Sequence, residues 1–194
     1  KAGINERIEI FSKLTDGIEK EIDLFGATSP LQLDPVFQHR VYAALDGPLY
    51  ASHSAKALAV ILLRIDGLIS EGGAKYDYDT ISVEHVLPQA PAPASQWFQW
   101  FPDPKAHAYW VHRLGNLALL SRRKNSAASN FDFDKKKKAY FTRNGISPFV
   151  LTTQVLQRDV WTESIINERH QELMAKMETF WRLDERADSL ANLL

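Results

Sequence analysis

The chain has 194 residues and a net charge of −1, with 45% hydrophobic and 24% charged residues, a composition typical of an ordinary globular protein. It contains no cysteine, which excludes disulfides and cysteine-ligated structural zinc. No run of eighteen apolar residues occurs, so we expect no membrane span. The absence of cysteine is compatible with the cytoplasmic location that we expect. The first residue is Lys1 and no signal peptide pattern follows, so we expect the chain to be part of a longer protein.

The near-zero net charge hides a strongly basic segment. Residues 121–143 carry eight Lys and Arg side chains against two Asp side chains, a net charge of +6, which leaves −7 for the rest of the chain. A concentrated basic segment favours a polyanionic partner.

Residues 1–75 are predicted to form a helical scaffold or connector. Apolar side chains at helical spacing indicate an amphipathic helix over residues 4–25. A short helix is predicted over residues 34–45, and a more apolar, more buried helix over residues 54–70. We expect no chemistry in this part of the chain.

Residues 76–110 differ in character from what precedes them. Residues 78–83 are rich in strand-forming side chains, and Pro88 ends the predicted strand. Residues 88–110 are rich in Pro, Trp and Phe without a clear period, which predicts a long loop. The aromatic side chains have two open roles: stacking on nucleic-acid bases or filling a small core.

The remaining elements complete a fold class. A second strand is predicted over residues 115–120, and a helix over residues 122–130 that packs across both strands. Further helices are predicted from residue 151 and from about residue 162. The order predicts an α+β, mostly helical fold, in which a small ββα finger is embedded between N-terminal and C-terminal helices. The expected parts are residues 1–75, 76–145 and 146–194.

Four polar residues around the two predicted strands indicate a one-metal nuclease site. Phosphodiester hydrolysis needs a base for the attacking water and a cation for the phosphate. His85, at a strand end, has a suitable ordinary pKa. Oxygen atoms of Glu84 and Asn125 suit Mg²⁺, and Asn116 can donate and accept hydrogen bonds to support the site.

Each of these assignments has an alternative. Side chains alternate along a strand, so Glu84 and His85 serve one site only if the strand end bends; otherwise Glu84 belongs in a surface ion pair. Asn125 can instead cap a helix. His107 and His112 lie close in sequence and can either reach phosphate or pack in the protein.

The motif Glu84–Pro88, the Gly115-Asn116-Leu117 strand and the segment 124–126 resemble the His-Me finger (HNH, ββα-metal) nucleases. The longer pattern over residues 112–136 looks like the C-terminal nuclease domain of the GmrSD-type restriction and SspE phage-defence family. The resemblance implies His85 as general base, Glu84 and Asn125 as metal ligands, and Asn116 as support for the base. Asn125 stands where the histidine that completes the HNH name is found.

The resemblance also implies a divalent metal, Mg²⁺ or alternatively Mn²⁺, and an upstream nucleotide-hydrolysing domain in the same protein. The resulting hypothesis is that the chain is a metal-dependent DNA endonuclease or nickase. It would act on double-stranded DNA in a modification-dependent restriction system that defends against phage. Expected contacts to DNA phosphates come from the basic segment: Arg122, Arg123, Lys124, Lys135, Lys136, Lys137 and Lys138. The alternatives are a non-catalytic nucleic-acid-binding module and a helical protein-interaction scaffold, with the lysine run as a solvated face.

Overall fold

A computed structural model of the whole chain describes residues 3–24, 26, 29–70, 81–121, 130–141 and 147–183. The chain forms two units, one from Lys1–Val41 with Arg182–Leu194 and one from Tyr42–Trp181. Within the described ranges, no helix is long and apolar enough to cross a membrane. The predicted division into residues 1–75, 76–145 and 146–194 stays a prediction.

The first unit contains α1 (Ile4–Glu19) and the start of α2 (Pro35–Asp46). The amphipathic helix predicted over residues 4–25 is therefore shorter than expected. Glu21 has a φ of 52°, in the left-handed region that a continuing α-helix does not use. The apolar side chains Ile8 and Phe11 are 61% and 65% exposed.

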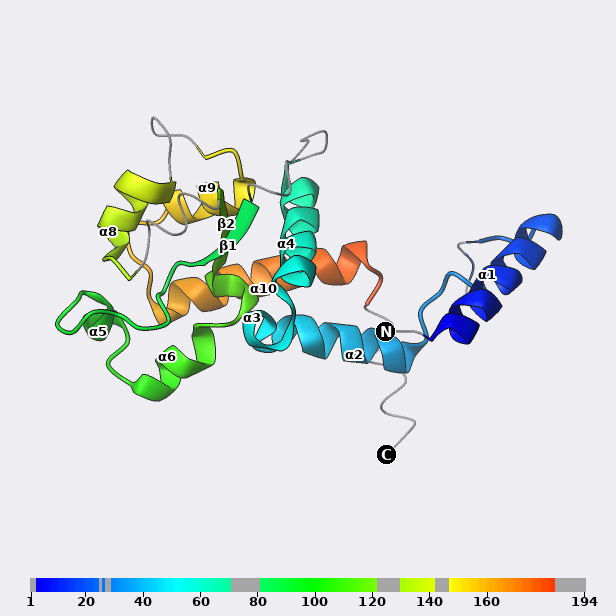
Figure 1. Cartoon of the computed structure of the whole chain (residues 1–194), viewed down its shortest axis with the longest axis horizontal. Helices are drawn as coiled ribbons and strands as arrows, with labels where there is room; N and C mark the ends of the chain where they lie inside the picture. The colour runs from blue at the N-terminus through cyan, green and yellow to red at the C-terminus, as the bar shows by residue number, and fades with distance from the viewer. Residues whose placement is uncertain are drawn as a thin grey trace. The chain divides into compact units, whose positions relative to one another are not determined.

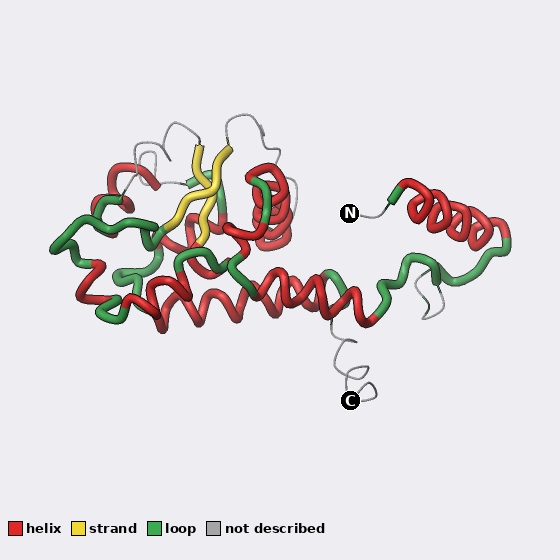
Figure 2. Tube along the Cα trace, turned by 60° about the horizontal axis from the view of Figure 1, so that its bottom comes forward, coloured by secondary structure: helices red, strands yellow, loops and turns green. Residues whose placement is uncertain are grey.

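The second unit is built around a two-stranded antiparallel sheet. Strand β1 (Ile81–His85) pairs with β2 (Leu117–Ser121), so that His85 lies opposite Leu117. The strands run side by side among the helices of this unit (Figure 2). The α+β, mostly helical fold expected from the sequence, with its small strand pair, is confirmed (Figure 1).

Helix α4 (Ala55–Ile69) packs against both strands. Ser54 caps it by accepting a hydrogen bond from the Ala57 amide at 3.3 Å. The side chains of Leu62 and Ile65 on α4 are fully buried. Near the other end of α4, the Asp66 carboxylate accepts the Leu151 amide at 2.7 Å, which ties α4 to α9 (Val150–Leu156).

The prediction of a long loop over residues 88–110 is wrong, because this segment contains α5 (Trp97–Trp100) and α6 (Pro104–Trp110). Helix α6 has a local cause: Asp103 caps it by accepting the Lys105 amide at 2.9 Å, and Pro104 fits the first helical position. Trp97 and Trp110 are 1% and 6% exposed and belong to the core. Core filling is therefore confirmed for these two rings.

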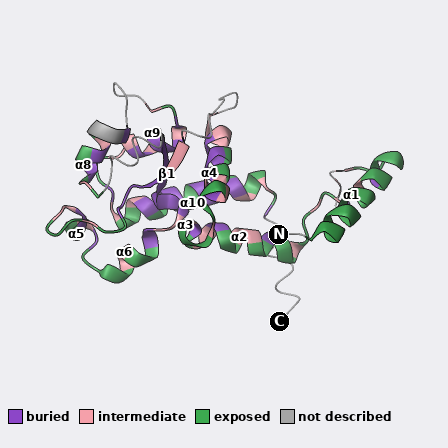
Figure 3. Cartoon of the chain, in the orientation of Figure 1, coloured by how far each residue is buried: buried purple, intermediate pink, exposed green. Residues whose placement is uncertain are grey.

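The second strand begins two residues later than predicted. Residues Leu114–Asn116 form a 3₁₀ turn, η2, which packs against α10 (Glu163–Phe180). Figure 3 shows that buried residues are concentrated on α4, on α10 and around the strands. The α10 side chain Arg169 is buried and donates to the carbonyl oxygens of Gly115 at 2.7 Å, Leu117 at 2.9 Å and Leu151 at 3.0 Å.

The basic segment contains two short helical elements that the sequence did not predict. The helix predicted over residues 122–130 lies outside the described residues, apart from Asn130. The chain then forms a short α8 (Phe133–Lys135) and a π-helical turn, η3 (Lys136–Phe141), which the sequence reasoning did not predict. The turn η3 contacts α9. The α3 turn (Leu49–Ser52) was also not predicted.

Candidate active site

His85 is the last residue of β1, and its ring contacts side chains from other segments. Its Nε2 atom lies 3.1 Å from Nδ1 of His112, and its Nδ1 atom lies 3.2 Å from Nε2 of Gln89. The ring of Tyr50, which comes from α3, meets the His85 ring edge-on with centroids 4.1 Å apart. The same Tyr50 ring stacks on His112 at 5.7 Å. The imidazole of His85 is therefore held at both nitrogens and at the ring.

Both histidines of this contact are neutral near pH 7. Burial is the largest cause that lowers the pKa of His85 from 6.5 to about 3, and electrostatic interactions with His112 and Lys136 lower it further. Burial also lowers the pKa of His112, with a further contribution from His107. A neutral imidazole carries one proton and one basic nitrogen. His85 therefore has a nitrogen with the chemistry of a proton acceptor.

Glu84 is buried and forms an ion pair with Lys136 from η3, with Oε1 and Nζ 2.7 Å apart. The Lys136 ammonium also donates to the carbonyl oxygens of His85 at 2.7 Å and Val86 at 3.2 Å. All three donors of the ammonium are therefore used. Burial raises the pKa of Glu84 and lowers that of Lys136, while the charge of each residue opposes the shift of the other.

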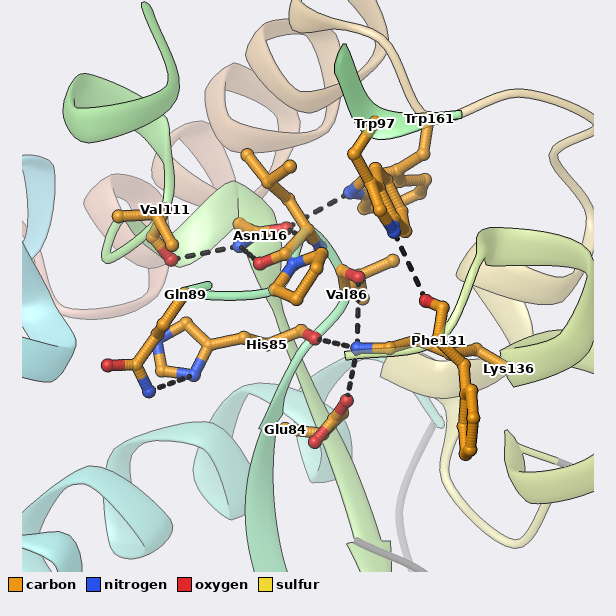
Figure 4. A network of polar contacts seen from close by, with 12 residues as sticks. Glu84, His85, Val86, Gln89, Trp97, Val111, Asn116, Phe131, Lys136 and Trp161 are labelled. Carbon is orange, nitrogen blue, oxygen red and sulfur yellow. Dashed lines mark hydrogen bonds and ion pairs between the residues drawn. The ribbon is translucent and has the colours of Figure 1, made fainter. Parts of the chain in front are cut away.

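The side chains of Glu84 and His85 point away from each other, as neighbours on a strand do (Figure 4). The carboxylate of Glu84 faces Lys136, and the His85 ring faces Gln89. The ion-pair alternative for Glu84 describes this arrangement, although the pair is buried rather than at the surface. The structure thus does not bring the Glu84 carboxylate to the His85 ring.

Asn116 is fully buried and holds the segment that follows β1. Its Oδ1 atom accepts the Leu87 amide at 2.7 Å and the Trp161 indole N–H at 3.0 Å. Its Nδ2 atom donates to the carbonyl oxygens of Leu87 at 3.0 Å and Val111 at 2.8 Å (Figure 4). The side chain makes no described contact with the His85 ring. Its place is that of a supporting residue that sets the path of the chain just beyond His85.

The expected DNA-contacting side chains are found in different environments. Lys136 is 0% exposed, so the expectation that it contacts DNA phosphate is wrong for this structure. Lys137 is half-buried and donates to the carbonyl oxygen of Arg158. Lys135, above the ring of Phe131, and Lys138 are exposed. The remaining expected contacts lie outside the described residues: Arg122, Arg123 and Lys124, together with the expected metal ligand Asn125.

A comparison with protein-family models identifies the family of the chain. The model of the GmrSD restriction endonucleases, C-terminal domain, matches residues 39–176. The chain belongs to this family. The match covers α4, both strands and most of α10. It also covers the His85 cluster, which consists of His85 with Tyr50, Gln89 and His112. The GmrSD domain therefore includes helices that precede and follow the strand pair in the sequence. A search of the curated proteins found no significant match.

The GmrSD domain has an aromatic cavity next to the His85 cluster. The cavity has a volume of about 260 Å³, and Gln89, Phe98 and His107 line it. Phe98 is 52% exposed, unlike its buried neighbour Trp97. His107 is fixed by a contact of 2.9 Å between its Nε2 atom and the carbonyl oxygen of Pro88. Base stacking thus stays open for Phe98, while the tryptophans of this segment fill the core.

Oxygen ligands for a metal are few among the residues that the structure describes. Within those ranges, no group of three or more His, Asp or Glu side chains is placed to hold a metal ion. Glu84 can supply one carboxylate, which here is paired with Lys136. The described residues around His85 therefore do not by themselves form a metal site.

Sequence reasoning missed two residues of the His85 cluster. Tyr50 lies in the segment where no chemistry was expected, and nothing in its sequence context marks it. Gln89 follows Pro88 directly, and no sequence pattern marks it as a contact of His85. His112, which was left open between phosphate contact and packing, contacts His85.

Proposed function

We propose that this GmrSD domain is a metal-dependent DNA endonuclease that nicks double-stranded DNA in anti-phage, modification-dependent restriction. The single observation that carries the proposal is the position of His85 at the end of β1, with its ring held by His112 and Gln89, in a chain that belongs to a restriction endonuclease family. His85 takes a proton from water, and that water attacks the scissile phosphate. One such site per chain cuts one strand.

The low pKa of His85 bears on this role in two ways. It keeps the ring unprotonated and so able to accept a proton. The low pKa also makes the imidazole a weak base as long as no anion lies beside it. A DNA phosphate next to His85 would raise the pKa of its imidazole toward the useful range, because a nearby negative charge favours the protonated form.

The proposal includes a divalent cation, Mg²⁺ or alternatively Mn²⁺, with Glu84 and Asn125 as its protein ligands. When bound, the cation would neutralise charge on the phosphate and on the departing oxygen. For Glu84 to bind such a cation, its carboxylate has to leave the ion pair with Lys136. Asn116 keeps the chain beyond β1 in place through its four hydrogen bonds.

The proposed partners follow from the charge distribution and from the family. Double-stranded DNA suits the basic segment, in which Lys135 and Lys138 are exposed. Arg122, Arg123 and Lys124 are proposed to contribute further phosphate contacts. The upstream partner is a nucleotide-hydrolysing domain of the same protein, and the proposed location is the cytoplasm.

The test is a supercoiled-plasmid assay with Mg²⁺ or Mn²⁺. We expect the 194-residue chain to convert supercoiled plasmid to open circles, and EDTA to stop the conversion. The His85→Ala variant should be inactive, whereas the His39→Ala variant, which changes an exposed histidine on α2, should keep full activity. Equal conversion by the wild type and the His85→Ala variant would refute the role of His85.

A second candidate function is a non-catalytic DNA-binding module. One observation favours it: both nitrogens of His85 are engaged, and the Glu84 carboxylate is paired with Lys136. This candidate predicts that the wild type and the His85→Ala variant shift DNA equally in a gel and leave the plasmid intact.

A further inference from the structure

The hydrogen bonds at the His85 ring determine where its proton lies. Two neutral imidazoles share a hydrogen bond only if one donates and the other accepts. The contact of 3.1 Å between His85 Nε2 and His112 Nδ1 leaves both directions open. The second contact of the ring, from Gln89, decides between them.

Gln89 contacts His85 through its amide nitrogen, which lies 3.2 Å from Nδ1. An amide NH₂ group donates and does not accept, so Nδ1 of His85 must be the unprotonated, accepting nitrogen. The single proton of the neutral ring is then on Nε2. The Nε2–H group donates to Nδ1 of His112, whose own proton must lie on its Nε2 atom.

Tyr50 fixes the geometry of this contact. Its ring stacks on His112 with an interplanar angle of 12°, and meets the His85 ring at 63°. Its backbone amide donates to the carbonyl oxygen of His112 at 3.0 Å. His112 is therefore held by its backbone and by its ring face, so its Nδ1 atom stays directed at His85.

We propose that His112 is a positioning residue: its Nδ1 atom holds His85 in the Nε2–H tautomer, which leaves the basic Nδ1 atom facing Gln89. The Gln89 amide occupies the place on Nδ1 from which a proton would be accepted, so it has to be displaced by the attacking water. The catalytic consequence of this inference rests on the proposed function. The tautomer of His85 can be measured whether or not the chain cleaves DNA.

The direct test is a two-bond ¹H–¹⁵N correlation spectrum of the 194-residue chain labelled at histidine, with the His85 signals assigned from the His85→Ala variant. We expect the Nε2–H pattern for His85 in the wild type. An Nδ1–H pattern would overturn the proposal without any need for a variant. It would mean that the Gln89 amide is reversed and that His112 is the donor.

Two variants test the role of His112. Phe in the His112→Phe variant keeps an aromatic ring for Tyr50 but removes the acceptor, so the His85 signals should become those of a mixture of tautomers. Asn in the His112→Asn variant restores an acceptor and should recover the wild-type pattern. An unchanged His85 pattern in the His112→Phe variant would overturn the proposal, and the His39→Phe variant serves as the matched control.

Kinetics separate this proposal from the proposed function. If the chain nicks DNA, the His112→Phe variant should lower kcat on the order of ten- to a hundredfold with little change in KM, since orienting partners act at that scale. A rise in KM alone, with kcat kept, would contradict positioning. If the wild type shows the Nε2–H tautomer and the His112→Phe variant loses it, the positioning of His85 by His112 stands. If, in addition, neither protein nicks DNA, the nuclease proposal fails.

Discussion

Lys136 and Glu84 form an ion pair of 2.7 Å in which the lysine side chain has no exposed surface. The ammonium also binds the two carbonyl oxygens at the end of β1, so the pair joins η3 to the strand that carries His85. A buried charge that loses its partner is strongly destabilising.

The Lys136→Met variant is expected to lower the free energy of unfolding by about 3–5 kcal/mol, because it leaves the Glu84 carboxylate buried without a cation. Urea denaturation measures this change. The Glu84→Gln/Lys136→Met double variant should recover part of the loss, and the Lys138→Met variant, at an exposed position, should stay within about 0.5 kcal/mol of the wild type. Equal stability of the Lys136 and Lys138 variants would contradict the burial of the pair.

Two substitutions of Asn116 test its hydrogen bonds, and the Asp variant, although closer in shape, is expected to be no more stable than the Ala variant. The Asn116→Ala variant leaves the Leu87 amide and the Trp161 indole N–H without an acceptor, at about 1–3 kcal/mol for each buried group. In the Asn116→Asp variant, an oxygen replaces the amide nitrogen that donates to Leu87 and Val111. We therefore expect the Asp variant to melt at or below the temperature of the Ala variant. Thermal unfolding decides, and a wild-type melting temperature for the Asp variant would contradict the amide orientation.

Gly115 is predicted to be intolerant of a side chain. A Cβ atom there would collide with the backbone oxygen of Ile166 and lie 2.7 Å from the Cβ of His170. The Gly115→Ala variant should cost about 1–3 kcal/mol, since η2 and α10 must move apart. Gly67, inside α4, has no atom within 4 Å of such a Cβ, so the Gly67→Ala variant should instead stabilise by up to about 1 kcal/mol. Urea denaturation of the two variants compares them, and equal signs would contradict the packing.

The stability of the fold is expected to fall on acidification below about pH 6.5. Unfolded His85 takes up a proton near 6.5, whereas folded His85 does so only near a pKa of about 3. The unfolded state thus binds more protons between these values, so the free energy of unfolding rises with pH in this window. Burial lowers the pKa of His112 and His170 and gives the same sign. The raised pKa of Glu84 gives the opposite sign.

Urea denaturation at about pH 5 and pH 7 measures the His85 contribution by difference. The gap between the two pH values should be smaller in the His85→Asn variant than in the wild type. The matched His39→Asn variant, at an exposed histidine, should keep the wild-type gap. An unchanged gap in the His85 variant would show that this histidine is not the group that titrates.

Salt dependence of DNA binding should distinguish the four consecutive lysines. Replacing exposed Lys135 or Lys138 with Ala is expected to reduce the slope of log affinity against log salt by about 1 each, if each contacts a phosphate. The Lys56→Ala variant, which changes an exposed lysine on α4, provides the control. Slopes identical to the wild type in both Lys135 and Lys138 variants would remove the run from the DNA interface.

The strand pair and the position of His85 were predictable because their signals are local. Strand-forming side chains, a stop at Pro88 and a second apolar run predict both strands, and they give the bounds of β2 to within two residues. The core role of the tryptophans was one of two open readings. Helix α6 was missed although Asp103-Pro104 is a recognisable start signal.

The His85 cluster was only partly predictable, since its contacts join segments that are far apart in sequence. No local pattern at Tyr50 indicates that its ring will meet His85. Lys136 is different, because a signal existed. A helical turn has about 3.6 residues, so four consecutive lysines cover almost the whole circumference and one of them must face inward. Which one does so depends on how η3 packs.

The grip of Arg169 on three carbonyl oxygens has a consequence for how this domain can be moved between proteins. The carbonyl oxygens around η2 and the start of β2 are bound by a side chain that lies 54 residues after Gly115 and 52 residues after Leu117. The chain has no cysteine for a zinc clamp, and among the described residues the carbonyl oxygens of Gly115 and Leu117 are bound by this buried guanidinium. Any recombination or fusion that transplants the strands must therefore carry α10 with them, and the unit of exchange is the whole helical block rather than the finger.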